Sequence, residues 1–164
     1  APRLVVWPAK DMKGVPTHFG NPEWPNPLAD QPEEEQDVTK CGYVVSVQLQ
    51  QEIAGRIGEC DITLWESRKG GRPPAKNFVA KRSQEMTQWA SRCKKEVVGY
   101  KHTPKVPLNK KRDLRDVLFF IPKEPLKAGK TYQARASMQL GGADMLVMVW
   151  EFTCGRQKEG LKLK

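Results

Sequence analysis

Two histidines and five methionines are the side chains of this 164-residue chain that could bind a soft transition metal. Imidazole suits copper and zinc, and thioether sulfur suits copper. One reading of the chain is therefore a periplasmic copper or zinc protein, with the ligands His18, His102, Met138, Met145 and Met148. Met145 and Met148 fall on opposite faces of one apolar strand, however, which is typical of core packing. We therefore expect that the protein binds no metal and no cofactor. A metal site built from these residues is the alternative interpretation.

Catalytic patterns are missing from the chain. No G-x-S-x-G motif occurs that could expose a serine nucleophile beside a histidine base. The carboxylates of Asp61, Glu66 and Glu151 could approach each other across strands, but their spacing does not single them out for glycoside chemistry. The glycine pairs at 70–71 and 141–142 lack the strand-to-helix setting of a phosphate-binding loop. We therefore expect a protein that is not an enzyme.

Four cysteines, Cys41, Cys60, Cys93 and Cys154, are widely spaced and form no C-x-x-C pair. This spacing is poor for zinc and favours two disulfides, hence an oxidising compartment and a secreted or periplasmic protein. Four cysteines allow three pairings, of which we expect Cys60–Cys93 and Cys41–Cys154. The other reading is four reduced thiols in the core.

The positive charge of the chain, +9 overall, is concentrated in one segment. Residues 81–135 hold 15 basic and 5 acidic side chains, whereas residues 1–40 hold 4 basic and 7 acidic ones. Such a segment attracts anionic polymers, and interspersed aromatic rings can stack on sugars or bases. The predicted binding residues are Lys94, Lys95, Lys101, Lys105, Lys110, Lys111, Arg112, Trp89 and Tyr100. For an exported protein we expect an anionic envelope polysaccharide rather than nucleic acid; the plainer reading is a solvated charged loop.

The domain organisation follows from length and apolar runs. A chain of this length fits one domain, which we expect at 1–157, followed by a polar C-terminal tail at 158–164. The longest apolar stretch, 145–150, is too short to span a bilayer. The sequence opens at Ala1 without a charged and then apolar segment, so we expect any export signal to have been removed already. A spacer or docking role beside an adjacent domain is a further hypothesis.

Strand patterns dominate the chain. Apolar residues alternate or run continuously in segments 4–7, 43–50, 61–66, 117–121, 131–138 and 145–153, each bounded by proline or glycine. The run at 117–121 predicts a strand buried on both faces. Only residues 81–92 show helical spacing, so one short helix is predicted there. The expected fold is an all-β sandwich of about seven strands with a long basic insertion at 66–115.

Several phrases of the sequence together resemble a known family. They are residues 5–8 and 13–16, 22–28, 41–47, 121–132 and 150–153. These segments resemble the bacterial immunoglobulin-like (Ig-like) modules of secreted proteins, most closely the module that accompanies cysteine-rich-secretory-protein-like (CAP) domains. The resemblance implies an accessory Ig-like sandwich without catalytic activity or cofactor. The four cysteines and the basic insertion depart from the pattern.

The most specific phrase, P-x-x-P-L-x-x-G-x-x-Y, consists of residues that shape a fold. Pro122 and Pro125 end one strand and fix the crossing to the next. Leu126 can close the end of the core, and Gly129 allows a left-handed turn. Tyr132, early in its strand, is suited to a corner hydrogen bond with nearby backbone.

Overall fold

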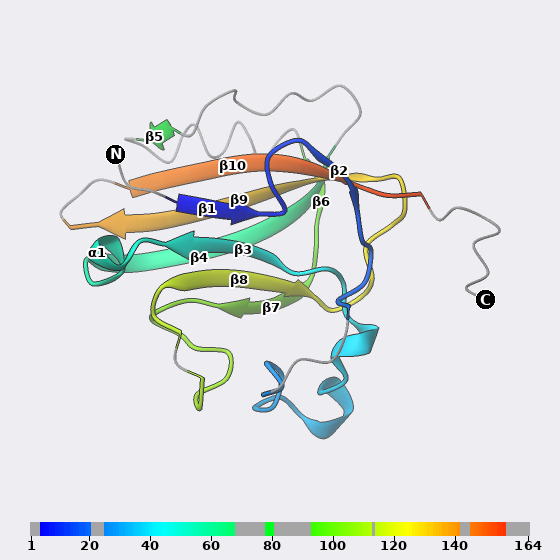
Figure 1. Ribbon diagram of the computed structural model, residues 1–164, viewed down its shortest axis with the longest axis horizontal. Helices are drawn as coiled ribbons and strands as arrows, with labels where there is room; N and C mark the ends of the chain where they lie inside the picture. The colour runs from blue at the N-terminus through cyan, green and yellow to red at the C-terminus, as the bar shows by residue number, and fades with distance from the viewer. Residues whose placement is uncertain are drawn as a thin grey trace.

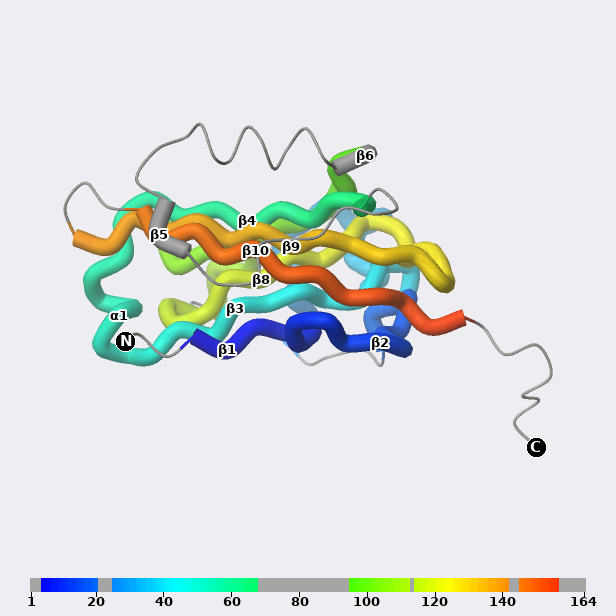
Figure 2. The backbone as a smooth tube through the Cα atoms, turned by 90° about the horizontal axis from the view of Figure 1, so that it is seen from above, coloured from blue at the N-terminus to red at the C-terminus, as the bar shows by residue number. Residues whose placement is uncertain are grey.

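The backbone folds into two stacked β-sheets (Figures 1 and 2). The computed structural model describes residues 4–20, 25–67, 78–80, 93–112, 114–141 and 145–156. Side chains of 78–80 and 93–94 lie outside this description. The architecture confirms the predicted all-β sandwich.

The first sheet has four strands in the order β1-β3-β8-β7. All neighbours in it pair antiparallel. Their bounds are β1 Leu4–Trp7, β3 Val45–Leu49, β8 Val117–Pro122 and β7 Gly99–His102.

The second sheet has the order β2-β10-β9-β4-β6, and β5 also pairs with β10. Strand β2 runs parallel to β10, and the other pairs are antiparallel. The bounds are β2 Met12–Val15, β10 Met145–Cys154, β9 Thr131–Leu140, β4 Ile57–Ser67, β6 Cys93–Glu96 and β5 Phe78–Ala80. Helical segments are single turns: η1 Glu33–Glu35, η2 Val38–Lys40 and α1 Gln51–Ala54. No helix in the described ranges is long and apolar enough to cross a membrane.

The order of strands is that of immunoglobulin domains. Taken along the chain, β1, β3, β8 and β7 occupy the places of strands A, B, E and D, and β10, β9, β4 and β6 those of G, F, C and C′. The corner between E and F is present as well, since the backbone N–H of Lys127 donates to Tyr132 Oη at 2.8 Å. The corner bond expected for Tyr132 is therefore confirmed.

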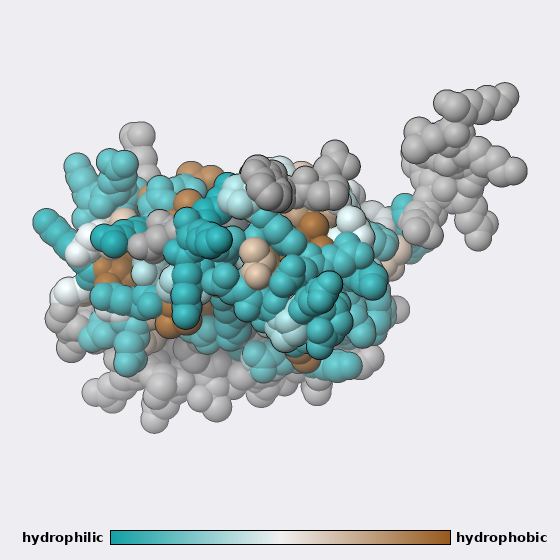
Figure 3. Space-filling model, turned by 90° about the horizontal axis from the view of Figure 1, so that it is seen from below, coloured by the Kyte–Doolittle hydropathy of each residue, from teal (hydrophilic) through white to brown (hydrophobic). Residues whose placement is uncertain are grey.

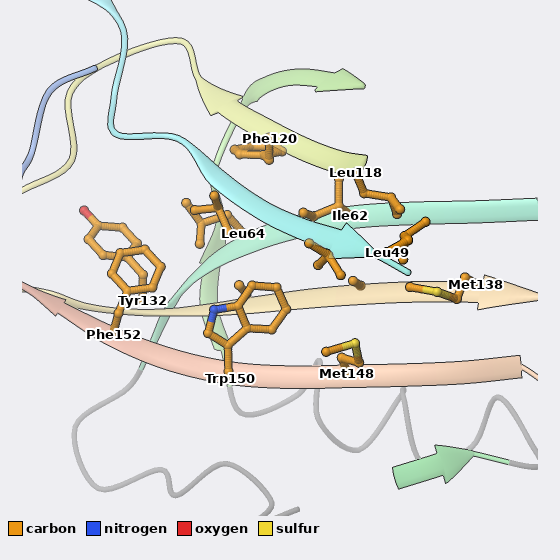
Figure 4. Close-up of a cluster of buried hydrophobic side chains, with 14 of the residues drawn as sticks. Leu49, Ile62, Leu64, Leu118, Phe120, Tyr132, Met138, Met148, Trp150 and Phe152 are labelled. Carbon is orange, nitrogen blue, oxygen red and sulfur yellow. The ribbon is translucent and has the colours of Figure 1, made fainter. Parts of the chain in front are cut away.

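The main core lies between the sheets (Figure 4). Val45, Val47 and Leu49 point into it from β3, as their alternation predicts, and each is at most 2% exposed. Trp150 and Phe152 of β10 pack beside the Tyr132 ring, which stacks on Phe152 with a centroid separation of 5.9 Å. Aromatic side chains bury large apolar areas, so this cluster contributes strongly to the stability of the sandwich.

A second, smaller cluster covers the outer face of the first sheet, on the side away from the main core. It consists of Phe19, Leu28, Val38, Cys41, Tyr100, Leu108 and Ile121. It forms because β8 is apolar on both faces: Leu118 and Phe120 face the main core, while Phe119 and Ile121 face the second cluster. The strand predicted to be buried on both faces is thus confirmed.

The basic insertion is shorter than predicted. Within 66–115, strands β6 and β7 belong to the two sheets of the sandwich, and β5 adds to β10. The prediction of about seven strands is also too low, because the structure describes ten. Three of them, β5, β6 and β7, lie within the predicted insertion. The predicted helix at 81–92 lies outside the described residues, and so does the tail at 158–164.

The structure corrects the predicted disulfides. Cys41, Cys60 and Cys154 carry free thiols. Cys41 belongs to the second cluster and Cys154 to the main core, so the first sheet separates them. Cys93 stands opposite Ser67 in the β4–β6 pairing. Cys60 lies seven positions before Ser67 on β4, which at about 3.3 Å per residue places it more than about 20 Å from Cys93, beyond the reach of a disulfide.

The buried thiol of Cys154 predicts a loss of stability at alkaline pH. Burial raises the pKa of Cys154 from 9.0 to about 11. Unfolding then releases a proton between these values, because the exposed thiol ionises near pH 9 while the native one stays protonated. The free energy of unfolding should fall from pH 9 to pH 11, as measured by urea titration. The variant Cys154→Ala should show a smaller fall; an equal fall would contradict this assignment.

Candidate functional site

A pocket opens on the outer face of the first sheet, beside the second cluster. Its volume is about 400 Å³, within the range of small-ligand sites. We call it the outer-face pocket, and its lining is Phe19, Pro27, Val44, Ser46, Gln48, His102, Asn109, Arg112, Leu114, Asp116, Val117, Phe119 and Ile121. Strands β3, β7 and β8 supply the floor of the pocket. Its walls come from two loops, one that contains Pro27 and one between β7 and β8 that contains Asn109 and Arg112.

A cross-strand row forms the centre of the floor. Ser46 is the partner of Phe119 in the β3–β8 register, and His102 is the partner of Phe119 in the β7–β8 register. The rings of His102 and Phe119 stack with centroids 4.6 Å apart and an interplanar angle of 4°. Because Ser46 is small, the opposite side of the Phe119 ring is not filled by its neighbour on β3.

His102 is buried, with 1% of its surface exposed, and both of its ring nitrogens have partners. The backbone N–H of Leu108 donates to Nδ1 at 3.1 Å. Nε2 lies 2.8 Å from the carbonyl oxygen of Leu114. A backbone N–H can only donate and a carbonyl can only accept, so the imidazole is the neutral tautomer with its proton on Nε2. These bonds fix the loop of residues 103–116 to the sheet and hold the ring beneath the pocket.

The two wall loops are joined to each other. Asn109 donates from Nδ2 to the carbonyl of Asn26 at 2.9 Å, and the backbone N–H of Lys110 donates to Asp30 Oδ2 at 2.8 Å. Asn26 in turn donates from its side chain to the carbonyl of Gln36 at 2.7 Å. Both loops lie along the lower side of the molecule in Figure 1. The pocket walls are therefore held by hydrogen bonds and are largely preformed.

Some polar groups of the pocket already have hydrogen-bond partners, and others do not. Gln48 donates from Nε2 to the backbone carbonyl of Asp116 at 3.2 Å. Within the described part of the chain, the carboxylate of Asp116 and the hydroxyl of Ser46 have no hydrogen-bond or ionic partner. Arg112 already has an interaction of its own. Asp116 and Ser46 are thus groups that a ligand could engage.

The predicted basic residues do not gather on one patch. Lys95 is exposed on β6 of the second sheet, whereas Lys101 on β7 pairs with Asp61 at 2.9 Å. Lys105 is exposed in the loop after β7. Lys110 and Lys111 are exposed next to Arg112, and these three stand at the outer-face pocket or beside it. Trp89 and the side chain of Lys94 lie outside the described residues.

Tyr100 is placed inside the fold. Only 9% of its surface is exposed, and it packs in the second cluster. The Lys123 ammonium lies 4.9 Å from the ring centroid and also 3.6 Å from Glu35 Oε1. Burial, reinforced by Glu35, raises the pKa of Tyr100 to about 12. The ring therefore stabilises the second cluster and is not offered to a ligand at the surface.

The candidate metal ligands are separated by the first sheet. Met138 and Met148 are buried between the sheets, whereas His102 lies on the outer face. Met145 is 38% exposed at the start of β10, and His18 lies in an exposed loop, 2.8 Å from Thr17 Oγ1. In the described ranges no three histidine, cysteine or acidic side chains gather as a metal site would require.

Sequence reasoning missed the floor of the pocket, namely Ser46, Gln48, Asp116 and Phe119. A signal for it was present in the run at 117–121. In a two-layer sandwich, alternate residues of each strand face solvent, so apolar Phe119 and Ile121 on the outer face require a cover. A loop folded over that face creates both the second cluster and the pocket.

Comparison with protein-family models finds no match, and comparison with curated protein sequences finds none either.

Proposed function

We propose that this chain is a non-catalytic binding module of a secreted or periplasmic protein, and that it binds an acidic envelope polysaccharide at the outer-face pocket. The observation that carries the proposal is the position of the pocket. It is preformed, and its wall loop presents the exposed cations Lys110 and Lys111 beside Arg112.

The face of the molecule seen from below is mostly hydrophilic, which suits a polar polymer. Figure 3 shows this face; in the part that is described, hydrophobic side chains form only small spots on a mostly hydrophilic surface. Exposed hydrophobic side chains next to the pocket floor are Val5 and Trp7 of β1, opposite Gln48 and Ser46. Broad exposed apolar patches are typical of obligate protein interfaces. A polysaccharide can place one residue in the pocket while its acidic groups lie along the cationic loop.

The resemblance to Ig-like modules of secreted proteins supports an exported accessory role. The observed strand order and the Tyr132 corner agree with that resemblance at the level of the fold. The cysteines no longer support it, because the three described thiols are free. The location of the protein is therefore proposed from the resemblance alone.

The cationic loop should make binding dependent on salt. We expect acidic polysaccharides that also contain uncharged residues (hyaluronan, gellan or xanthan) to retard the protein in affinity electrophoresis, and the double variant Lys110→Gln/Lys111→Gln to weaken binding about tenfold at low salt. High salt should reduce the difference. Lys13→Gln, an exposed lysine on β2, is the matched control and should bind as wild type. Absence of retardation by all three polymers would refute the proposed function.

A further inference from the structure

The Phe119 ring is a fixed platform in the outer-face pocket. One of its faces stacks on His102, whose two nitrogens are both hydrogen-bonded. On the other side its cross-strand neighbour is Ser46, whose side chain is short. An aromatic face of this kind binds flat, partly apolar groups by dispersion and by its electron-rich π system. The C–H-bearing face of a pyranose ring is such a group.

Hydrogen-bond acceptors line the same pocket as this platform. The Asp116 carboxylate and the Ser46 hydroxyl have no partner within the described ranges, and the Gln48 amide uses its N–H₂ on the backbone. A ligand that carries several hydroxyl donors would satisfy these groups. A charged carboxylate acceptor forms stronger hydrogen bonds than a neutral one, so Asp116 should contribute most.

We infer that the outer-face pocket binds one uncharged sugar residue, with its ring on Phe119 and its hydroxyl groups donating to Asp116 and its neighbours. The inference rests on the proposed function and names the part of the polysaccharide that enters the pocket. Acidic residues of the same polymer would then lie outside, along the loop of Lys110 and Lys111.

Other ligands fit the pocket less well. A uronate in the pocket would bring its carboxylate towards the Asp116 carboxylate, and the two like charges would repel each other. A wholly apolar ligand would cover the Asp116 carboxylate without a partner, which is costly because a buried charge loses its hydration. An uncharged residue with hydroxyl groups avoids both costs.

The test is a titration of the full chain with short oligosaccharides, followed by nuclear magnetic resonance of the side-chain amides of Gln48 and Asn109. The probes are neutral oligosaccharides of glucose, N-acetylglucosamine and mannose, and for comparison oligosaccharides of galacturonate. We expect at least one neutral probe to shift both amide signals, with little dependence on salt.

Two substitutions separate the contributions of the floor. Asp116→Asn keeps the shape but removes the charge, and Phe119→Leu keeps an apolar side chain but removes the flat ring. Each should weaken binding of the neutral probe about tenfold, as the loss of a charged hydrogen bond or of an aromatic contact implies. Asp61→Asn changes a carboxylate on β4, outside the pocket, and should bind as wild type.

The possible outcomes distinguish the two proposals. If only galacturonate oligosaccharides bind, or if a neutral probe binds equally to wild type and Asp116→Asn, the inference of a hydroxyl-bonded uncharged residue is wrong while the binding module stands. If neither neutral nor acidic saccharides bind, both the inference and the proposed function are wrong. Shifts of both amides with loss in both variants support the inference.

Discussion

Replacing His102 with alanine is expected to lower the free energy of unfolding by about 3 kcal/mol. The change leaves the N–H of Leu108 and the carbonyl of Leu114 without their partner, and each buried orphaned group costs about 1–3 kcal/mol. It also removes the ring that stacks on Phe119. Urea denaturation of the variant and the wild type measures the difference.

His18→Ala is the matched control, since His18 is the other histidine of the chain and is exposed. Its effect should stay within about 0.5 kcal/mol, as is usual for exposed positions. A loss below about 1 kcal/mol for His102→Ala would show that the two hydrogen bonds do not hold the loop of residues 103–116. That result would also remove the support for a rigid Phe119 platform.

The sandwich could be predicted from the sequence where strands bury one face. Val45, Val47 and Leu49 alternate with polar residues, and all three are buried. Tyr132 could be placed as well, because a tyrosine early in a strand after a proline-rich corner has one well-known hydrogen bond to make. For these elements, the local sequence pattern was sufficient to predict the structure.

Strands β6 and β7 could not be predicted in the same way. Cys93–Glu96 and Gly99–His102 are four residues each and are rich in lysine or glycine, so they match the pattern of a charged loop. Both lie at sheet edges, where charged side chains are common because they discourage pairing with other chains. Their strand conformation depends on the neighbours β4 and β8, which the local sequence does not reveal.

The candidate site could be predicted only in part from the sequence, because strand pairing brings together residues that are far apart in the chain. Arg112, Lys110 and Lys111 belong to a basic run that is visible in the sequence, and they do stand at or beside the pocket. Ser46 and Asp116 are 70 positions apart and line one pocket only because β3 pairs with β8. The predicted disulfides failed likewise, because cysteine spacing does not show which sheet face each thiol occupies.

The central claim is that the outer-face pocket is where the ligand binds, and filling the pocket tests it most directly. Ser46→Phe places a large ring on the floor beside Phe119, on a face that is half-buried and outside the main core. The substitution should therefore leave the thermal midpoint close to that of the wild type. Thr63→Phe, on a half-buried strand position of the second sheet that does not line the pocket, is the control.

The measurement is affinity electrophoresis of wild type, Ser46→Phe and Thr63→Phe through gels containing the acidic polysaccharide that retards the wild type most strongly. We expect Ser46→Phe to lose its retardation almost completely, while Thr63→Phe migrates like the wild type. Retardation of Ser46→Phe equal to that of the wild type would contradict the account, because the polymer would then bind through the exposed lysines without entering the pocket.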